Sequence, residues 1–365
     1  MNRNLQEYLL NLIQKQNFTP GERVILSLLE ILEFTYSVLV HSRNFLYDQG
    51  ILPVKKVETS VVSVGNLTVG GTGKTPVVEK LAAQYTDRGQ FPAVILRGYR
   101  AEAERPAVVS DGQEILLGAR EAGDEAFMLA CKLPGVPVVI GKDRYRAAQL
   151  ACQEFSPDVI LLDDGFQHRR LARDRDILVL DGTRPFGYQH LLPRGLLREP
   201  LSGFKRAQQV IINHCRQINP GQYDKIKQKV RNYNPDIEIT GATYQPCHLE
   251  LPPDMAGDVP ELNTVRGKKV LAVAGIGNPR SFARDLQQTG FEVSETCFFP
   301  DHHQYTRADG KKISAHARSS GLEWIITTEK DMVKMDREIL NLITDQGLQI
   351  FVLISEIKFL APEEI

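Results

Sequence analysis

Short runs of apolar residues alternate with helix-compatible segments along the chain from Glu58 onward. The runs are rich in Val and Ile and too short for helices, so each predicts a buried strand. They comprise Val61–Val64, Ala93–Leu96, Val136–Ile140, Val159–Leu162, Ile177–Leu180 and Val210–Asn213. Continuously apolar strands linked by helices predict an α/β fold, in which helices cover both faces of a parallel sheet. Ligands of such folds bind beyond the carboxyl ends of the strands.

A passage that contains Pro and Gly, from Tyr244 to Gly267, interrupts this alternation and is expected to be irregular. Beyond it, apolar runs at Val270–Ala274 and Trp324–Thr328 predict a second, smaller α/β domain. We expect the last apolar run, Gln349–Ile354, to pair near a Glu238–Thr243 strand and so to connect the domains. Glycines follow the Val270–Ala274 run, but the third glycine of a dinucleotide-binding motif is missing, so we predict no such site.

A glycine-rich turn joins the Val61–Val64 strand to a helix that opens with Lys74 and Thr75. Glycines let backbone N–H groups crowd around an anion, and the helix N-terminus adds a partial positive charge. Lys74 would then reach the β- and γ-phosphates of a nucleotide, and the Thr75 hydroxyl would ligate Mg²⁺. Thr68 stands where the general motif has its first glycine. The strand–turn–helix context still predicts a phosphate loop made of Thr68, Val69, Gly70, Gly71, Thr72, Gly73, Lys74 and Thr75.

Two carboxylates, Asp163 and Asp164, end the apolar strand Val159–Leu162. A rigid strand can deliver such an acid to the Mg²⁺ that a phosphate loop holds. We interpret the pair as a Walker B motif and expect Gln167 and His168 beside the metal. Which of the two carboxylates ligates Mg²⁺ stays open.

Asp124 directly precedes a predicted helix, Glu125–Lys132. Capping the helix N-terminus is the commonest role of such an aspartate. A general base is the alternative, because phosphoryl transfer to an alcohol needs a carboxylate or histidine near the attacking hydroxyl. From the residues alone we favour the cap.

Five further polar runs are considered for candidate chemistry. Phe299–Tyr305 contains an acid, two imidazoles and a phenol, and a polar interdomain loop is favoured over a zinc site because further ligands at suitable spacing are missing. Tyr99 and Arg144 belong to cation-bearing turns that suit an anionic substrate and a solvated surface equally. The turn-rich, charged loop Leu192–Pro200 suggests a role. The run Thr328–Asp331 has no chemistry that its residues assign.

The segment Val24–Val40 is strongly apolar and compatible with a helix. It is shorter than the roughly 20 residues of a spanning helix and carries Glu30 and Glu33, so we expect it not to span a membrane. It could lie at a membrane interface, with basic residues on both flanks, or pack on the nucleotide-binding core. The residues alone favour neither alternative.

Composition narrows the class of protein. A net charge of −1 gives no argument for a nucleic-acid partner. Five scattered cysteines without a C-x-x-C spacing predict reduced thiols rather than disulfides or a zinc site. The polar N-terminus of mixed charge predicts no cleavable signal peptide, so we expect the protein on the cytoplasmic side. Nothing indicates an obligate protein partner.

Taken together and in this order, the motifs closely resemble those of the tetraacyldisaccharide 4′-kinase family of lipid A synthesis. The resemblance covers about Glu58 to Lys334, and Thr68 of the phosphate loop is part of that family's pattern. It rests on Gly65–Pro76, Arg97–Tyr99, Gly123–Glu125, Leu162–His168, Leu197–Pro200, Asp301–His303 and Thr328–Asp331.

The resemblance implies ATP- and Mg²⁺-dependent phosphorylation of the 4′-hydroxyl of tetraacyldisaccharide 1-phosphate. It implies that Asp124 accepts the hydroxyl proton and that His302, which directly follows Asp301, pairs with it across the interdomain cleft. Lys74 and Thr75 would hold phosphate and Mg²⁺. The remaining implied roles are completion or support of the metal site by Asp163, Asp164 and Glu199, and weaker substrate or nucleotide contacts by Tyr99 and Arg144.

The implied domain organisation has four parts. Residues 1–56 form an N-terminal amphipathic segment, 57–243 a phosphate-loop kinase domain, 244–350 the smaller domain, and 351–365 a final strand and tail. Since the substrate carries four acyl chains, the resemblance favours an N-terminal helix at the membrane surface. The expected location is peripheral, at the cytoplasmic face of the inner membrane.

Two rival functions are considered. A partitioning-type ATPase with a deviant Walker motif would carry a signature lysine just before the glycine pair, where this chain has Val69. It would also leave Asp124 and Asp301 without roles. A phosphate-loop kinase of a soluble metabolite would share the nucleotide site but give the Val24–Val40 segment no purpose.

Overall fold

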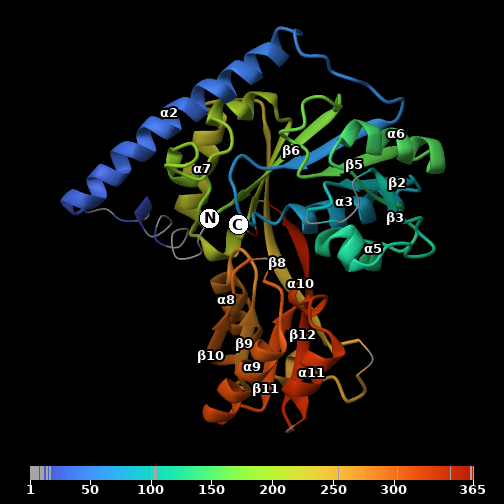
Figure 1. The fold of residues 1–365 in the computed structure, drawn as a ribbon, viewed down its shortest axis with the longest axis vertical. Helices are drawn as coiled ribbons and strands as arrows, with labels where there is room; N and C mark the ends of the chain where they lie inside the picture. Colours follow the sequence, from blue (N-terminus) through green and yellow to red (C-terminus); the bar gives the residue numbers. More distant parts are fainter. Residues whose placement is uncertain are drawn as a thin grey trace.

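One mixed sheet runs through the whole molecule (Figure 1). The computed structural model describes residues 8, 12–13, 15, 18–99, 101, 105–253, 255–301, 303–345, 347–361 and 364. Within these residues the sheet has the order β10-β9-β11-β12-β8-β7-β6-β1-β5-β2-β4-β3. The strands are β1 Ser60–Gly65, β2 Pro92–Leu96, β3 Ala107–Ser110, β4 Val138–Ile140, β5 Val159–Asp163, β6 Arg175–Asp181, β7 Gln209–Asn213, β8 Glu238–Glu250, β9 Lys269–Ala274, β10 Glu292–Phe298, β11 Trp324–Thr328 and β12 Gln349–Leu360.

Helices connect most of these strands. The α-helices are α2 Pro20–Asp48, α3 Lys74–Asp87, α4 Ala119–Ala122, α5 Asp124–Lys132, α6 Arg144–Phe155, α7 Pro220–Arg231, α8 Pro279–Thr289, α9 Arg307–Ser319, α10 Glu329–Met332 and α11 Arg337–Thr344. Short 3₁₀ turns occur at η1 Gly187–Gln189, η2 Leu201–Arg206, η3 Cys215–Gln217 and η4 Leu262–Thr264.

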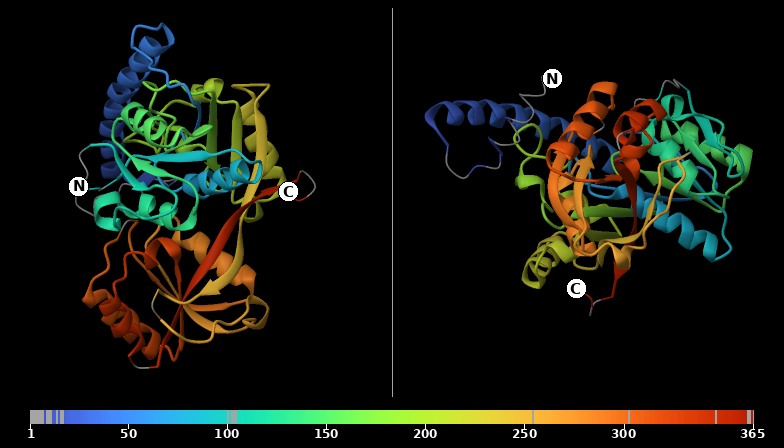
Figure 2. Two further views of the ribbon diagram at one scale, coloured as in Figure 1. Left: turned by 90° about the vertical axis from the view of Figure 1, so that its right-hand side faces the viewer. Right: turned by 90° about the horizontal axis from the view of Figure 1, so that it is seen from below.

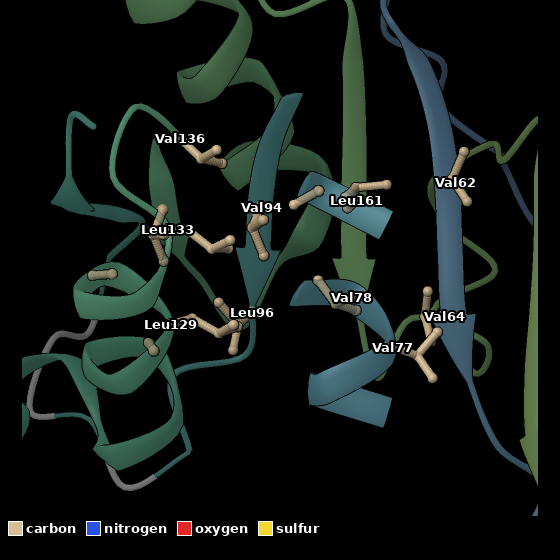
Figure 3. Close-up of a cluster of buried hydrophobic side chains, with 14 of the residues drawn as sticks. Val62, Val64, Val77, Val78, Val94, Leu96, Leu129, Leu133, Val136 and Leu161 are labelled. Atoms are coloured by element: carbon tan, nitrogen blue, oxygen red, sulfur yellow. The ribbon is translucent and has the colours of Figure 1, made fainter. Parts of the chain in front are cut away.

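Neighbouring residues of β1 pack against helices on opposite faces of the first half of the sheet. Val62 and Val64 of β1 pack with α3 and α5 on one face (Figure 3). Val61, between them, packs with Ala147 and Ala148 of α6 on the other face. Successive side chains of a strand point to opposite faces, so a strand buried on both must be apolar throughout. The predicted α/β fold is confirmed.

Two long strands join this half to the second one (Figure 2). β8 and β12 pair antiparallel from Gly241↔Leu360 to Glu250↔Val352, whereas β12 also pairs parallel with β11. The final run pairs with the strand that starts at Glu238, as predicted, but Val352–Ile354 lie opposite His248–Glu250, and the predicted part of the strand pairs with Lys358–Leu360 instead. The expectation of an irregular passage from Tyr244 was wrong for its first part, because β8 continues to Glu250. Pro246 sits at a register shift, where a strand tolerates proline.

The second half repeats the architecture on a smaller scale. Helices α9 and α11 pack on one face of β9, β11 and β12, and α8 packs on the other. The division into residues 57–243 and 244–350, with a tail from 351, stays a proposal. Its boundaries fall inside β8 and β12, the strands that both halves share.

Helix α2 is longer than predicted and lies against the first half of the molecule (Figure 1). It begins after a capping box of Thr19 and Glu22, with Pro20 at its first position, and runs for 29 residues. By length and composition alone it could cross a membrane. The predicted helix length, too short to span a membrane, was therefore wrong. The contacts of α2 with the rest of the chain are a better guide to its role.

Candidate active site

A cavity of about 830 Å³ lies between the two halves. The phosphate loop, the end of β5 and the start of α5 line it from the first half. The turn after β9, Asp301 and the start of α10 line it from the second, and Tyr36 and Arg43 of α2 also reach it. As predicted, the carboxyl ends of the parallel strands carry the site.

The phosphate loop is held in shape by polar side chains from neighbouring strands. Asn66 donates from Nδ2 to the Thr72 hydroxyl at 3.1 Å, and Asn213 donates from Nδ2 to the Thr72 carbonyl at 3.2 Å. Gly73 has a φ of +89°, and a Cβ there would lie 2.3 Å from Nδ2 of Asn213. Only glycine fits this approach, so the turn that precedes Lys74 depends on it.

Thr75 and Asp163 meet as the two motifs predicted. The Thr75 hydroxyl donates to Oδ2 of Asp163 at 2.7 Å, although 88 residues separate them in the chain. Asp163 is 4 % exposed, and burial together with the charge of Glu125 raises its pKa to about 6. Its Oδ1 has no hydrogen-bond partner among the described residues. A buried carboxylate oxygen left over in this way costs free energy unless a cation or donor satisfies it.

These residues fit Mg²⁺. Asp163 and the Thr75 hydroxyl supply hard oxygen atoms, and Mg²⁺ typically takes one or two protein oxygens and completes its shell with phosphate oxygens and water. Among the described residues, three or more His, Cys, Asp or Glu side chains do not gather as a metal cage.

Asp164 is engaged by cations. Its two oxygens each accept from Nη1 of Arg198 at 3.0 Å, and Nζ of Lys74 lies 3.6 Å from Oδ1. Burial raises the pKa of Asp164, but the charges of Lys74 and Arg198 outweigh it, so that the pKa falls below its ordinary value. Asp164 therefore orients Lys74, while Asp163 is the carboxylate with an oxygen left unpaired within the described part of the chain.

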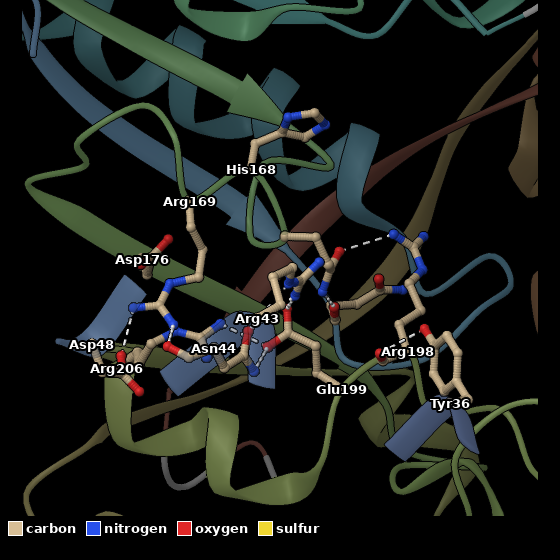
Figure 4. A network of polar contacts seen from close by, with 12 residues as sticks. Tyr36, Arg43, Asn44, Asp48, His168, Arg169, Asp176, Arg198, Glu199 and Arg206 are labelled. Carbon is tan, nitrogen blue, oxygen red and sulfur yellow. Dashed lines mark hydrogen bonds and ion pairs between the residues drawn. The ribbon is translucent and has the colours of Figure 1, made fainter. Parts of the chain in front are cut away.

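The contacts of Glu199 differ from those expected of a residue at the metal site. The residue is fully buried, and its carboxylate accepts from Arg43 at 3.1 Å, Asn44 at 3.1 Å and Arg206 at 2.9 Å (Figure 4). Both oxygens are used, and Glu199 does not line the cavity. The structure thus gives Glu199 the task of fastening α2 to the core, in place of the predicted completion or support of the metal site.

Arg144, like Glu199, is a buried charged residue. It is 1 % exposed, donates to the Gly141 carbonyl at 2.8 Å and does not line the cavity. Burial lowers its pKa to about 10, with Asp164 acting against this shift and Arg97 adding to it. The buried guanidinium does not reach the cavity, and the predicted substrate or nucleotide contact stays a prediction. Arg144 contributes its charge to the electrostatics of the Asp163–Asp164 pair.

Asp124 and Tyr99 line the cavity together with the phosphate loop. Asp124 is the first residue of α5, whose N-cap is Gly123 without a side-chain cap bond, so the favoured cap interpretation was wrong. Tyr99 is 54 % exposed. His302 lies outside the described residues, and its predicted pairing with Asp124 stays a prediction. The neighbouring His303 bonds Asp309 at 3.1 Å.

The structure places Gln167 and His168 differently relative to the cavity. Gln167 lines the cavity and bonds both the Asn66 carbonyl at 2.9 Å and Arg198 at 3.0 Å, so it braces the phosphate loop. His168 does not line the cavity. Burial and the nearby charge of Arg144 lower its pKa to about 4, which keeps its ring neutral. Gln167 thus borders the cavity and His168 does not, and the expected place of Gln167 beside a metal stays a prediction.

The structure shows the contacts of two segments whose residues alone assigned no specific role. The loop Leu192–Pro200 ties α2 to the phosphate loop: Leu196 accepts from the backbone N–H of Val69 at 2.8 Å, and Arg198 bonds Asp164. Thr328–Asp331 forms the N-terminal turn of α10 and borders the cavity from the second half. Their turn-rich, charged composition was a signal of function but named no partner.

The combination of a phosphate loop, its strand-borne aspartate and a separate acid on one cavity wall is that of the phosphate-loop kinases. A family model described as tetraacyldisaccharide-1-P 4′-kinase matches residues 25–365. A tetraacyldisaccharide 4′-kinase of Halothermothrix orenii is 43 % identical over 98 % of this chain and 95 % of its own length. One of Anaeromyxobacter dehalogenans is 41 % identical over 80 % of this chain and 77 % of its own. The chain belongs to the tetraacyldisaccharide 4′-kinase family.

A solved structure agrees with this assignment. The crystal structure of LpxK from Aquifex aeolicus in complex with ATP matches with a TM-score of 0.69 and 30 % identity. The match covers 93 % of this chain and 96 % of that one. The predicted family, fold and enzyme class are therefore confirmed, and the partitioning-type ATPase is set aside.

Proposed function

We propose that the protein transfers the γ-phosphoryl group of ATP to the 4′-hydroxyl of tetraacyldisaccharide 1-phosphate, a step of lipid A synthesis. The observation that carries the proposal is one cavity that holds the phosphate loop, the open Oδ1 of Asp163 and the carboxylate of Asp124. Family membership supplies the substrate. A phosphate-loop kinase of a soluble metabolite would use the same nucleotide site but not the lipid.

In this proposal each group of the cavity has a distinct task. The backbone of the phosphate loop and Lys74 hold the phosphates, and Asp164 keeps Lys74 in place. Thr75 and Asp163 hold Mg²⁺, which when bound neutralises charge on the phosphates. Asp124 accepts the proton of the attacking hydroxyl, with His302 as its proposed partner. Contacts between the two halves exclude water and so limit wasteful hydrolysis of ATP.

We further propose that α2 lies on the cytoplasmic membrane surface. One side of the helix is docked: Glu33 accepts from the Leu191 backbone at 2.8 Å, Tyr36 donates to the Arg198 carbonyl at 2.9 Å, and Asn44 bonds Glu199. A helix held along its length in this way is placed to lie on a bilayer rather than to cross it. Its other side exposes Val24, Leu28, Ile31, Leu32, Phe34, Val38, Leu39 and Phe45.

Several of these exposed residues are three or four positions apart, such as Val24, Leu28 and Ile31, so they form one apolar face. Such a face can sink into the headgroup region, and it would bring the acyl-disaccharide close to Tyr36 and Arg43 at the cavity. The expected basic flank contributes less, because Lys15 is paired with Glu22 and Arg43 with Glu199. Apolar burial, more than charge, therefore supports the membrane proposal.

Substituting Ile31→Asp together with Leu39→Asp is expected to weaken vesicle binding by about tenfold or more for each side chain. Full burial of one such side chain is worth about 1.5–3 kcal/mol. Co-sedimentation with phospholipid vesicles measures the effect, and Ile31→Leu with Leu39→Ile is the matched control. Equal binding of the Asp variant and the wild type would show that this face does not meet the membrane.

The position of the new phosphate tests the assigned substrate. The purified protein is incubated with ATP, Mg²⁺ and tetraacyldisaccharide 1-phosphate, and the product is examined by ³¹P–¹H NMR. The proposal predicts a second phosphorus resonance that couples to the proton at C4′. Coupling at another sugar position, or a diphosphate at C1, would contradict it.

A further inference from the structure

Lys330 joins the two halves of the molecule at the cavity. Its Nζ lies 3.1 Å from Oε1 of Glu125 in the first half and 3.3 Å from Oδ1 of Asp301 in the second. Its side chain is 21 % exposed, so water screens these pairs less than it would on the open surface. Without this ammonium, two carboxylates from opposite halves would face each other.

The first turn of α10, which carries Lys330, is held in place by several hydrogen bonds. Thr328 caps α10 through its bond from the Asp331 backbone N–H, and fully buried Asp331 accepts from Gly275 N at 2.9 Å. Gly275 belongs to the turn after β9, and Gly277 of that turn lies against the phosphate loop: a Cβ at Gly277 would lie 3.0 Å from the Gly71 nitrogen. The start of α10 is thus fixed relative to both the turn after β9 and the phosphate loop.

The two partners of Lys330 stand next to the proposed catalytic pair in the chain. Glu125 follows Asp124 in the first turn of α5, and Asp301 directly precedes His302. We propose that Lys330 is a positioning residue, which holds the first turn of α5 against the segment that leads to His302. This inference rests on the proposed function and on the roles assigned there to Asp124 and His302.

The contacts of Lys330 support a positioning role rather than binding of nucleotide by Lys330 itself. Both ion pairs of Lys330 are with protein carboxylates. One of these carboxylates, Glu125, also raises the pKa of Asp163 through its negative charge. Burial lowers the pKa of Lys330, but Glu125 and Asp301 outweigh it and raise the pKa above its ordinary value, so the ammonium is charged throughout the physiological range. Its positive charge joins two carboxylates, Glu125 and Asp301, whose neighbours in the chain form the proposed catalytic pair.

The test compares Lys330→Met with Lys330→Arg in the lipid kinase assay. Loss of the bridge is expected to lower kcat by about 10- to 100-fold, the size of effect that misplacement by about 1 Å produces. The KM for ATP should stay within about threefold, because the phosphate loop is untouched. Lys330→Arg should restore most of kcat, since arginine can also bridge two carboxylates.

Lys80→Met is the matched control. Lys80 pairs with Glu356 at 3.9 Å across the α3–β12 contact and does not line the cavity, so kcat should be unchanged. A double-mutant cycle with Glu125→Gln adds a second readout: if both residues act through one bridge, the two losses are not additive. Should Lys330→Met fail to fold, kcat and KM of Glu125→Gln and of its combination with Lys330→Arg decide the question.

The outcomes separate the inference from the function on which it rests. Absence of lipid product with the wild-type protein would refute the proposed function. Normal wild-type transfer with unchanged kcat in folded Lys330→Met would refute the positioning role alone. A KM for ATP that rises as far as kcat/KM falls would show that Lys330 contacts the nucleotide, which also overturns the proposal.

Discussion

Replacing Asp124 by asparagine is expected to lower kcat by about two to four orders of magnitude, the usual contribution of a general base. ATP binding should persist, because the phosphate loop, Lys74 and the Thr75–Asp163 pair do not depend on this side chain. Rates of lipid phosphorylation and the ATP dissociation constant, measured on the same preparation, check both statements.

Asp87→Asn is the control for this variant, since Asp87 is exposed at the end of α3 and does not line the cavity. Its kcat should equal that of the wild type. If Asp124→Asn instead lost stability while its folded fraction kept full activity, a structural role at the start of α5 would explain Asp124, and the proposed base would be wrong.

Replacing Glu199 by alanine is expected to lower the free energy of unfolding by about 3–5 kcal/mol, the cost of breaking a buried ion pair. The substitution leaves Arg206 and Arg43 without their carboxylate partner and removes one of the contacts that hold α2 on the core. Urea unfolding measures the loss. The Mg²⁺ concentration that gives half-maximal activity should not change, because Asp163 and not Glu199 has the open oxygen.

The exposed residue Glu356 offers a comparison, since Glu356→Ala removes only a surface pair with Lys80, worth at most about 1 kcal/mol. A large rise in the Mg²⁺ requirement of Glu199→Ala, without loss of stability, would restore the metal-ligand role that the sequence suggested.

Features that depend on residues close together in the chain could be predicted from the sequence. Continuous apolar runs such as Val61–Val64 gave the strands of the parallel sheet, and the two motifs that contain Thr75 and Asp163 gave the nucleotide site. In each case the spacing of residues within one short segment fixes the geometry. The contact between the two segments follows from the general arrangement of phosphate-loop folds.

Roles that depend on distant contacts could not be predicted. Glu199 meets Arg43 across 156 residues, and Lys330 meets Glu125 across 205, so no spacing in the sequence signals either pair. Likewise, α2 is docked through Glu33 on Leu191, 158 residues away, and β8 passes Pro246 at a register shift. Asp124 looked like a cap because only the fold shows that Gly123 takes that position.

Transfer of labelled γ-phosphate from ATP–Mg²⁺ to tetraacyldisaccharide 1-phosphate in detergent micelles tests the central claim most directly. We expect a labelled bis-phosphorylated lipid with the wild-type protein and its loss in Lys74→Ala, because Lys74 is the cation of the phosphate loop. Hydrolysis of ATP without any labelled lipid would contradict the proposal. The nucleotide site would then stand, and a soluble acceptor would replace the lipid.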